Sequence, residues 1–146
     1  MAKLDDISWH LDSDEFPEGA PEENAATHIG MFVTWAINND LWGQFAGVDW
    51  SGPVQQVKDL EISGRTFLLE QCDGKLFSEM LNEKGAPFAE WYYDRYLKDF
   101  QRTLSKGLKS DYLVPDTWEN YERMAAVLTA QYKNPQPMAK PWWKFW

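Results

Sequence analysis

Few side chains in this sequence have the chemistry for catalysis. His28 and Cys72 could serve as a general base and a thiol nucleophile, but nothing in their spacing requires the two to meet. Both lie in segments with a helical, half-buried pattern, and a single cysteine on the inner side of a helix is usually a small hydrophobic residue. The pair therefore does not predict a cysteine enzyme.

Metal binding has little support from the residue pattern. His10 and His28 lie in different segments, without an HExxH motif or any other paired histidine spacing. Asp12, Asp14 and Glu15 resemble a calcium loop only loosely, because the required glycine and the distal glutamate are missing. The single cysteine excludes a cysteine-based zinc site and an intramolecular disulfide. We expect no metal ion and no cofactor.

Other catalytic motifs are also missing. The sequence has no glycine-rich phosphate loop and no GxSxG motif. Glu22 and Glu23 could line a pocket beside His28, as the active site of an enzyme would require. Negative charge is also favourable at the start of a helix, and we favour this second interpretation. The sequence predicts that the chain is not an enzyme.

The charge distribution restricts the possible partners. The net charge is -9, and the first 24 residues hold eight acids and one base, so they contribute -7 of it. An acidic chain binds nucleic acid or anionic lipid poorly, because proteins bind both through cationic side chains. Acidity favours encounter with a basic partner, although it could also serve only solubility.

Aromatic residues are interleaved with these acids, as in many protein interfaces. We expect a partner-binding surface here, with a solvated, partly ordered terminus as the alternative. The predicted surface consists of Trp9, Asp12, Asp14, Glu15, Phe16, Glu18, Glu22 and Glu23.

The elements that position these residues are mainly helices. Residues 1–24 form an acidic arm, in which Ile7, Trp9 and Leu11 alternate with polar residues and predict a strand or extended segment. A central helix is expected to start between Asn24 and Thr27, with apolar residues at the spacing of one buried face.

Four further helices follow from spacing and end signals. Short helices are expected over 54–61 and 63–72, and the last helix is expected to begin at Asp116, which forms a capping box with Glu119. The longest helix should span about 87–105, where large apolar residues recur every four positions and form one ridge. This ridge comprises Phe88, Tyr92, Tyr96, Phe100 and Leu104.

Together these elements predict a mainly α fold: one compact domain over residues 1–133, built from about five helices with a short extended or β arm at the amino terminus. Residues 134–146 form a proline-containing linker and an aromatic tail. The tail could pack on its own domain, dock into a partner or a second copy, or rest at a membrane interface. The tail residues with this potential are Trp142, Trp143, Phe145 and Trp146.

The opening residues lack the apolar core of a signal peptide, and no apolar run approaches the roughly 20 residues needed to cross a bilayer. We therefore expect a cytoplasmic protein. The acidic charge argues against nucleic acid as a partner, and a membrane stays an alternative only for the aromatic tail.

Four strings resemble a family of small bacterial proteins of unknown function. They are EENAATHIGM at 22–31, LEQCDGK at 69–75, LNEKG at 81–85 with Phe88 and Tyr92-Tyr93, and DTWENY at 116–121. The resemblance covers about residues 5–132. It implies a companion of polymorphic toxin and contact-dependent secretion systems, similar to immunity proteins, and it implies no catalytic residues.

The expected function is that of an intracellular immunity protein. Such a protein binds a cognate secreted toxin or effector domain, here a basic one, and blocks its active surface. The alternative is an adaptor or chaperone that docks onto a secretion component or a membrane through its aromatic tail. The two alternatives differ in the segment that makes the contact, which is the arm in one and the tail in the other.

Overall fold

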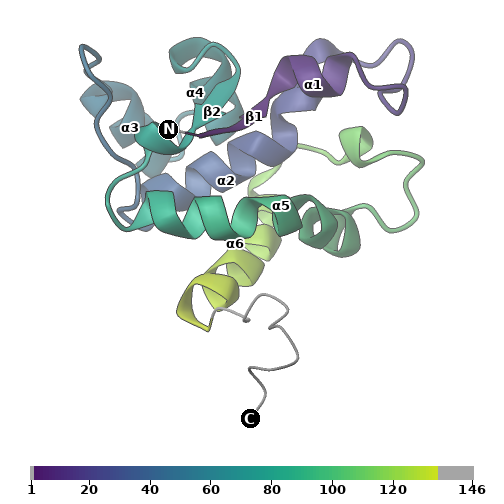
Figure 1. The fold of residues 1–146 in the computed structure, drawn as a ribbon. Coiled ribbons are helices and arrows are strands. Elements are labelled where there is room, and N and C mark those ends of the chain that lie inside the picture. Colours follow the sequence, from purple (N-terminus) through teal and green to yellow (C-terminus); the bar gives the residue numbers. More distant parts are fainter. Residues whose placement is uncertain (1, 135–146) are drawn as a thin grey trace.

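A computed structural model describes residues 2–134 of the chain, and its elements are mainly helical, as predicted (Figure 1). The α-helices are α1 (Ile7–Leu11), α2 (Thr27–Asn38), α3 (Ser51–Lys58), α4 (Gly64–Gln71), α5 (Gly85–Leu104) and α6 (Trp118–Lys133). Three short 3-10 helices are η1 (Glu22–Ala26), η2 (Ser78–Met80) and η3 (Asp111–Leu113). Strands β1 (Lys3–Asp6) and β2 (Lys75–Phe77) form an antiparallel pair.

The predicted central helix is confirmed as α2, which contacts α3, α4, α5 and α6. Every residue of α2 except Asn38 is buried, so the helix is enclosed on all sides and not only along one face. Its crossing with α4 is close because two glycines meet there. A Cβ atom added to Gly64 would lie 2.1 Å from the carbonyl oxygen of Gly30. Larger residues at this crossing would force α2 and α4 apart.

The predicted longest helix is confirmed as α5, and all five residues of its aromatic ridge are buried. Phe32 of α2 meets this ridge, with its ring 5.5 Å from the Tyr96 ring. Asp94 and Lys98 lie on the opposite, exposed face of α5. The four-residue spacing therefore forms the apolar face that covers α2, as expected for an amphipathic helix.

The predicted strand at Ile7, Trp9 and Leu11 is wrong, because these residues form helix α1. The strand β1 lies just before them. The side chain of Asp6 accepts a hydrogen bond from the backbone N–H of Ser8 at 2.9 Å and so caps the first turn of α1. Apolar residues at i and i+4 share one face of a helix as well as of a strand, so five residues do not distinguish the two periods.

The start of the last helix also differs from the prediction. Helix α6 begins at Trp118, and its cap is Thr117, whose hydroxyl accepts a hydrogen bond from the N–H of Asn120 at 3.1 Å. Asp116 instead forms an ion pair with Arg65, at 3.3 Å between Oδ2 and Nε. The capping box is therefore replaced by a contact that joins the start of α6 to α4.

The predicted tail contacts at residues 138–146 lie outside the described part of the chain. Within residues 2–134, no helix combines the length and apolar character that a membrane span needs.

Candidate functional site

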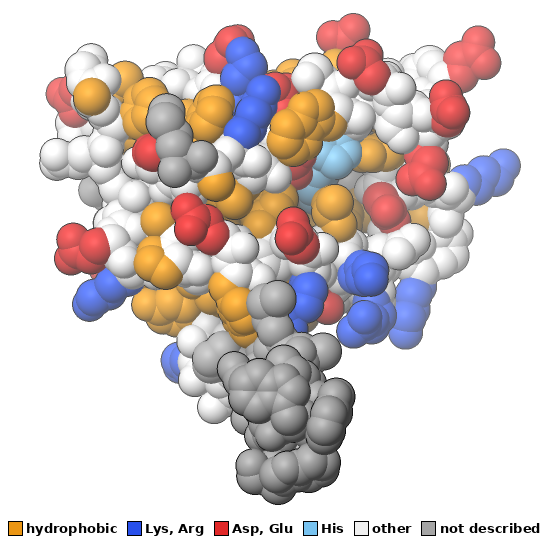
Figure 2. Space-filling view, in the orientation of Figure 1, with side chains coloured by type: hydrophobic (Ala, Val, Ile, Leu, Met, Phe, Trp, Pro, Cys, Tyr) orange, Lys and Arg blue, Asp and Glu red, His pale blue; other side chains and the backbone are white. Residues whose placement is uncertain are grey.

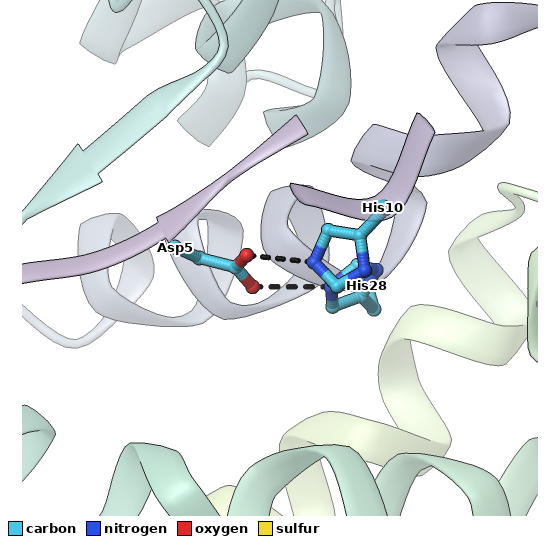
Figure 3. A group of neighbouring side chains, drawn as sticks. All are labelled: Asp5, His10 and His28. Carbon is cyan, nitrogen blue, oxygen red and sulfur yellow. Dashed lines mark hydrogen bonds and ion pairs between the residues drawn. The ribbon is translucent and has the colours of Figure 1, made fainter. Parts of the chain in front are cut away.

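Three elements bring Asp5, His10 and His28 together beneath α1 (Figure 3). Asp5 lies in β1, where it pairs with Leu76 of β2, and its side chain points to the protein interior. Helix α1 follows at once, and its short turn places His10 close to Asp5. His28 projects from the first turn of α2. We call these three residues the histidine–aspartate cluster.

The ligand atoms of the cluster converge. His10 Nε2 lies 2.7 Å from Asp5 Oδ1, and His28 Nε2 lies 3.1 Å from Asp5 Oδ2. The two Nε2 atoms are 3.1 Å apart, and the imidazole rings meet edge to face. Asp5 and His28 are 2% and 3% exposed, whereas His10 keeps 8% of its surface in contact with solvent.

An outer layer of polar groups surrounds the cluster. The hydroxyl of Tyr93, in α5, donates to Asp5 Oδ2 at 2.7 Å, and the backbone N–H of Asp6 donates to Asp5 Oδ1 at 2.8 Å. The hydroxyl of Tyr112, in η3, lies 2.6 Å from His10 Nδ1. A buried carboxylate needs such partners, because an unpaired charge in the interior is costly. The outer layer therefore connects the amino-terminal segment to α5 and η3.

Electrostatics keep Asp5 ionised. Burial alone would raise its pKa, but hydrogen bonds and charge interactions with His10 and His28 outweigh burial, so the pKa of Asp5 lies below its usual range. Burial lowers the pKa of His28 despite the neighbouring Asp5 carboxylate. Burial raises the pKa of Tyr93 well above its usual value and that of Tyr112 to about 12. At neutral pH Asp5 is therefore an anion, while Tyr93 and Tyr112 keep their phenolic protons.

The predicted partner-binding acids lie in a different environment. All six are exposed in the segment from α1 to η1, and acidic side chains gather over this part of the surface (Figure 2). Trp9 is 51% exposed, with the Lys3 ammonium 5.4 Å from its ring centre. Phe16 is only half-buried, but its ring packs 5.2 Å from that of Tyr112, so part of it serves internal packing.

A cavity of about 480 Å³ separates the acidic segment from the end of α5. Glu15 lines one side, and Lys106 and Lys109 contribute cationic groups. Tyr112 lines the same cavity, and its hydroxyl contacts His10. The cavity therefore lies one side chain away from the histidine–aspartate cluster.

The other candidate residues do not gather into a site. Glu22 and Glu23 are exposed in the first turn of η1, and a Glu23 carboxylate oxygen lies 3.8 Å from Arg65 Nη2. Cys72 is buried, and burial raises the pKa of its thiol to about 12, so it is not a thiolate at neutral pH. His28 is directed to Asp5 and His10.

Sequence reasoning missed the cluster because its members come from separate segments. In the sequence His10 and His28 stand as isolated histidines, and Asp5 is one of eight acids in the arm. The available signal was weak: both histidines of the chain lie within its first 28 residues, after an aspartate that follows an apolar residue. The pairing of β1 with β2 fixes Asp5 in the interior, and that pairing joins residues about 70 positions apart.

The part of the chain that matches a known family includes the whole histidine–aspartate cluster. The profile of a domain of unknown function, DUF7832, matches residues 3–114, and the chain belongs to this family. The match includes Tyr93 and Tyr112 and ends before α6. No curated protein and no solved structure matches the chain.

Proposed function

Starting from membership in a family without an assigned function, we propose that the protein acts by binding. Its partner is a basic toxin or effector domain, and the protein neutralises this domain by covering its active surface, as an immunity protein does. The observation that carries the proposal is the exposure of six carboxylates in one short segment beside the exposed indole of Trp9.

The charge and exposure of the six carboxylates support a role in the first encounter with a basic partner. The six carboxylates are Asp12, Asp14, Glu15, Glu18, Glu22 and Glu23. Like charges that are crowded in one segment repel one another, and within residues 2–134 only Glu23 of the six forms an ion pair, at 3.8 Å with Arg65. A basic partner would be steered toward them, and its association rate would fall as salt screens the attraction.

Trp9 gives the surface an apolar anchor. Large aromatic side chains dominate the energy of many interfaces, since they bury much area with little loss of side-chain freedom. Among the described residues, no other aromatic side chain is as exposed as that of Trp9. We propose that it inserts into the partner while the carboxylates complement the partner's basic groups.

The first experiment is capture of the partner from the native host with tagged protein, at low and at moderate salt. We expect one dominant basic protein, recovered less well at moderate salt. The purified partner is then titrated against a variant with Asp12, Asp14, Glu15 and Glu18 changed to lysine. Affinity should fall at least about tenfold, mainly through a slower association rate.

A matched control separates local from global charge. It carries four reversals at exposed acids outside the arm, namely Glu61, Glu70, Glu83 and Glu90. The two variants have the same net charge. If the arm binds the partner specifically, only the arm variant should lose affinity strongly. Equal losses of affinity would mean that net charge alone causes the effect, and unchanged affinity in both variants would rule out the electrostatic surface.

A further inference from the structure

We propose that Asp5, His10 and His28 form a binding site for one divalent transition-metal ion, with Zn²⁺ the best-fitting ion. The proposal concerns the isolated protein and does not depend on the proposed partner. It rests on the positions of three ligand atoms and on the protons that their contacts require.

The distances fit a metal centre. A tetrahedral zinc ion with Zn–N distances of about 2.0–2.1 Å holds its ligand atoms roughly 3.3 Å apart. His10 Nε2 lies 2.7 Å from Asp5 Oδ1, His28 Nε2 lies 3.1 Å from Asp5 Oδ2, and the two Nε2 atoms are 3.1 Å apart. These spacings are slightly shorter than those around a bound zinc ion, so the side chains would have to move apart only modestly to hold one.

While Asp5 carries its negative charge, no assignment of protons satisfies all three contacts at once. With Asp5 ionised, each of its histidine contacts requires a proton on that histidine's Nε2. The contact between the two Nε2 atoms requires that one of them lacks the proton. A cation removes the conflict, because all three atoms can then direct a lone pair at the same point.

The outer contacts suit a metal site as well. Tyr112 lies 2.6 Å from His10 Nδ1, so Nδ1–H can donate to the phenol oxygen and leave the Nε2 lone pair for the ion. Tyr93 donates to Asp5 Oδ2 and holds the carboxylate in place. Such outer partners orient metal ligands and commonly tune the affinity by about 10–100-fold.

The type of ligand selects the class of ion. Two imidazole nitrogens with one carboxylate suit zinc and its neighbours in the transition series, whereas calcium and magnesium prefer oxygen ligands. The His10 side chain is 11% exposed, and histidine atoms reach the surface in Figure 2, so an ion has a short path to the site. Three protein ligands would leave a fourth position for water.

The test uses the full chain after removal of any histidine tag and treatment with a chelator. Zn²⁺ is titrated by calorimetry, with Ca²⁺ as the comparison ion. We expect one Zn²⁺ per chain, with a dissociation constant of roughly 1 µM or lower, and no comparable binding of Ca²⁺. Absence of Zn²⁺ binding would overturn the proposal and leave the cluster as a hydrogen-bonded structural element.

Variants locate the ion. Asp5→Asn and His10→Gln should each weaken Zn²⁺ binding by at least about 100-fold, and Tyr112→Phe by about 10-fold. Asp14→Asn removes an exposed acid near the cluster in sequence and should leave affinity unchanged. Retention of full affinity in His10→Gln, or its loss in Asp14→Asn, would place the ion elsewhere and contradict the proposal.

Because a variant of a buried residue can fail to fold, a further measurement uses the unsubstituted protein. Nitrogen-15 NMR of the two histidines distinguishes a metal-bound Nε2 from a protonated one. We expect both Nε2 resonances to shift on addition of one equivalent of Zn²⁺, while His10 Nδ1 stays protonated. Unshifted histidine resonances in a zinc-bound protein would exclude the cluster as its site.

Discussion

The acids of the first 24 residues fall into two groups with opposite environments. Asp5 and Asp6 are 2% and 4% exposed and accept hydrogen bonds, whereas the six acids from Asp12 to Glu23 are exposed. Asp6 also forms an ion pair with Lys3 at 2.5 Å. Composition treats all eight as one acidic arm, but only the second group is available to a partner.

The difference between the groups shows that the position of a carboxylate decides its role. A buried carboxylate must be matched by donors, so Asp5 organises the side chains around it. An exposed carboxylate remains hydrated and acts mainly through its long-range field. The division between buried and exposed carboxylates can be tested through the free energy of unfolding. This is measured by urea unfolding in the presence of a chelator, so that no metal ion contributes.

The largest effect is expected for Asp5→Ala. The substitution leaves Tyr93, His10 and His28 without their buried acceptor, so the free energy of unfolding should fall by about 3–5 kcal/mol. Asp14→Ala, the exposed counterpart, should change it by less than about 0.5 kcal/mol. Similar losses in the two variants would remove the distinction between the groups.

A smaller effect is expected for Tyr93→Phe. This change deletes one buried hydrogen bond to a charged acceptor, so the free energy of unfolding should fall by about 1.5–3 kcal/mol. Tyr121→Phe is the control, because its hydroxyl accepts a hydrogen bond from the exposed Asn38 at 3.1 Å. We expect a loss of about 1 kcal/mol or less there, and a reversed order would contradict the central role of Asp5.

The smallest effect is expected for the fourfold lysine variant of Asp12, Asp14, Glu15 and Glu18. No ion pair of these acids is found among residues 2–134, and the change lowers the net negative charge. The free energy of unfolding should therefore stay within about 1 kcal/mol of the original protein. A large loss would mean that the exposed acids contribute to the fold, and the binding test would lose its basis.

Local patterns predicted much of the fold because their causes are local. The ridge of α5 follows from residue spacing, and Ser63 caps α4 by accepting from the N–H of Thr66 at 3.2 Å, as expected for a serine before a helix. Errors arose where a distant partner decided the outcome. The local spacing predicts Asp116 as a cap, but Arg65 forms an ion pair with its carboxylate.

The histidine–aspartate cluster could not be predicted for the same reason. His28 was assigned to the correct helix, and His10 to a segment whose type was wrong. Their contact depends on the antiparallel register of β1 and β2 and on the direction of α1, neither of which one sequence specifies. The exposure of the arm's acids was easier to foresee, because charged side chains without partners stay in water.

The contact between Asp5 and Tyr93 spans 88 residues, and that between His10 and Tyr112 spans 102. During synthesis, the buried side chains of β1 and α1 can therefore contact these partners only after β2, α5 and η3 have been made. The complete cluster with its two tyrosine contacts therefore requires at least the first 112 residues, whereas it requires no residue of α6.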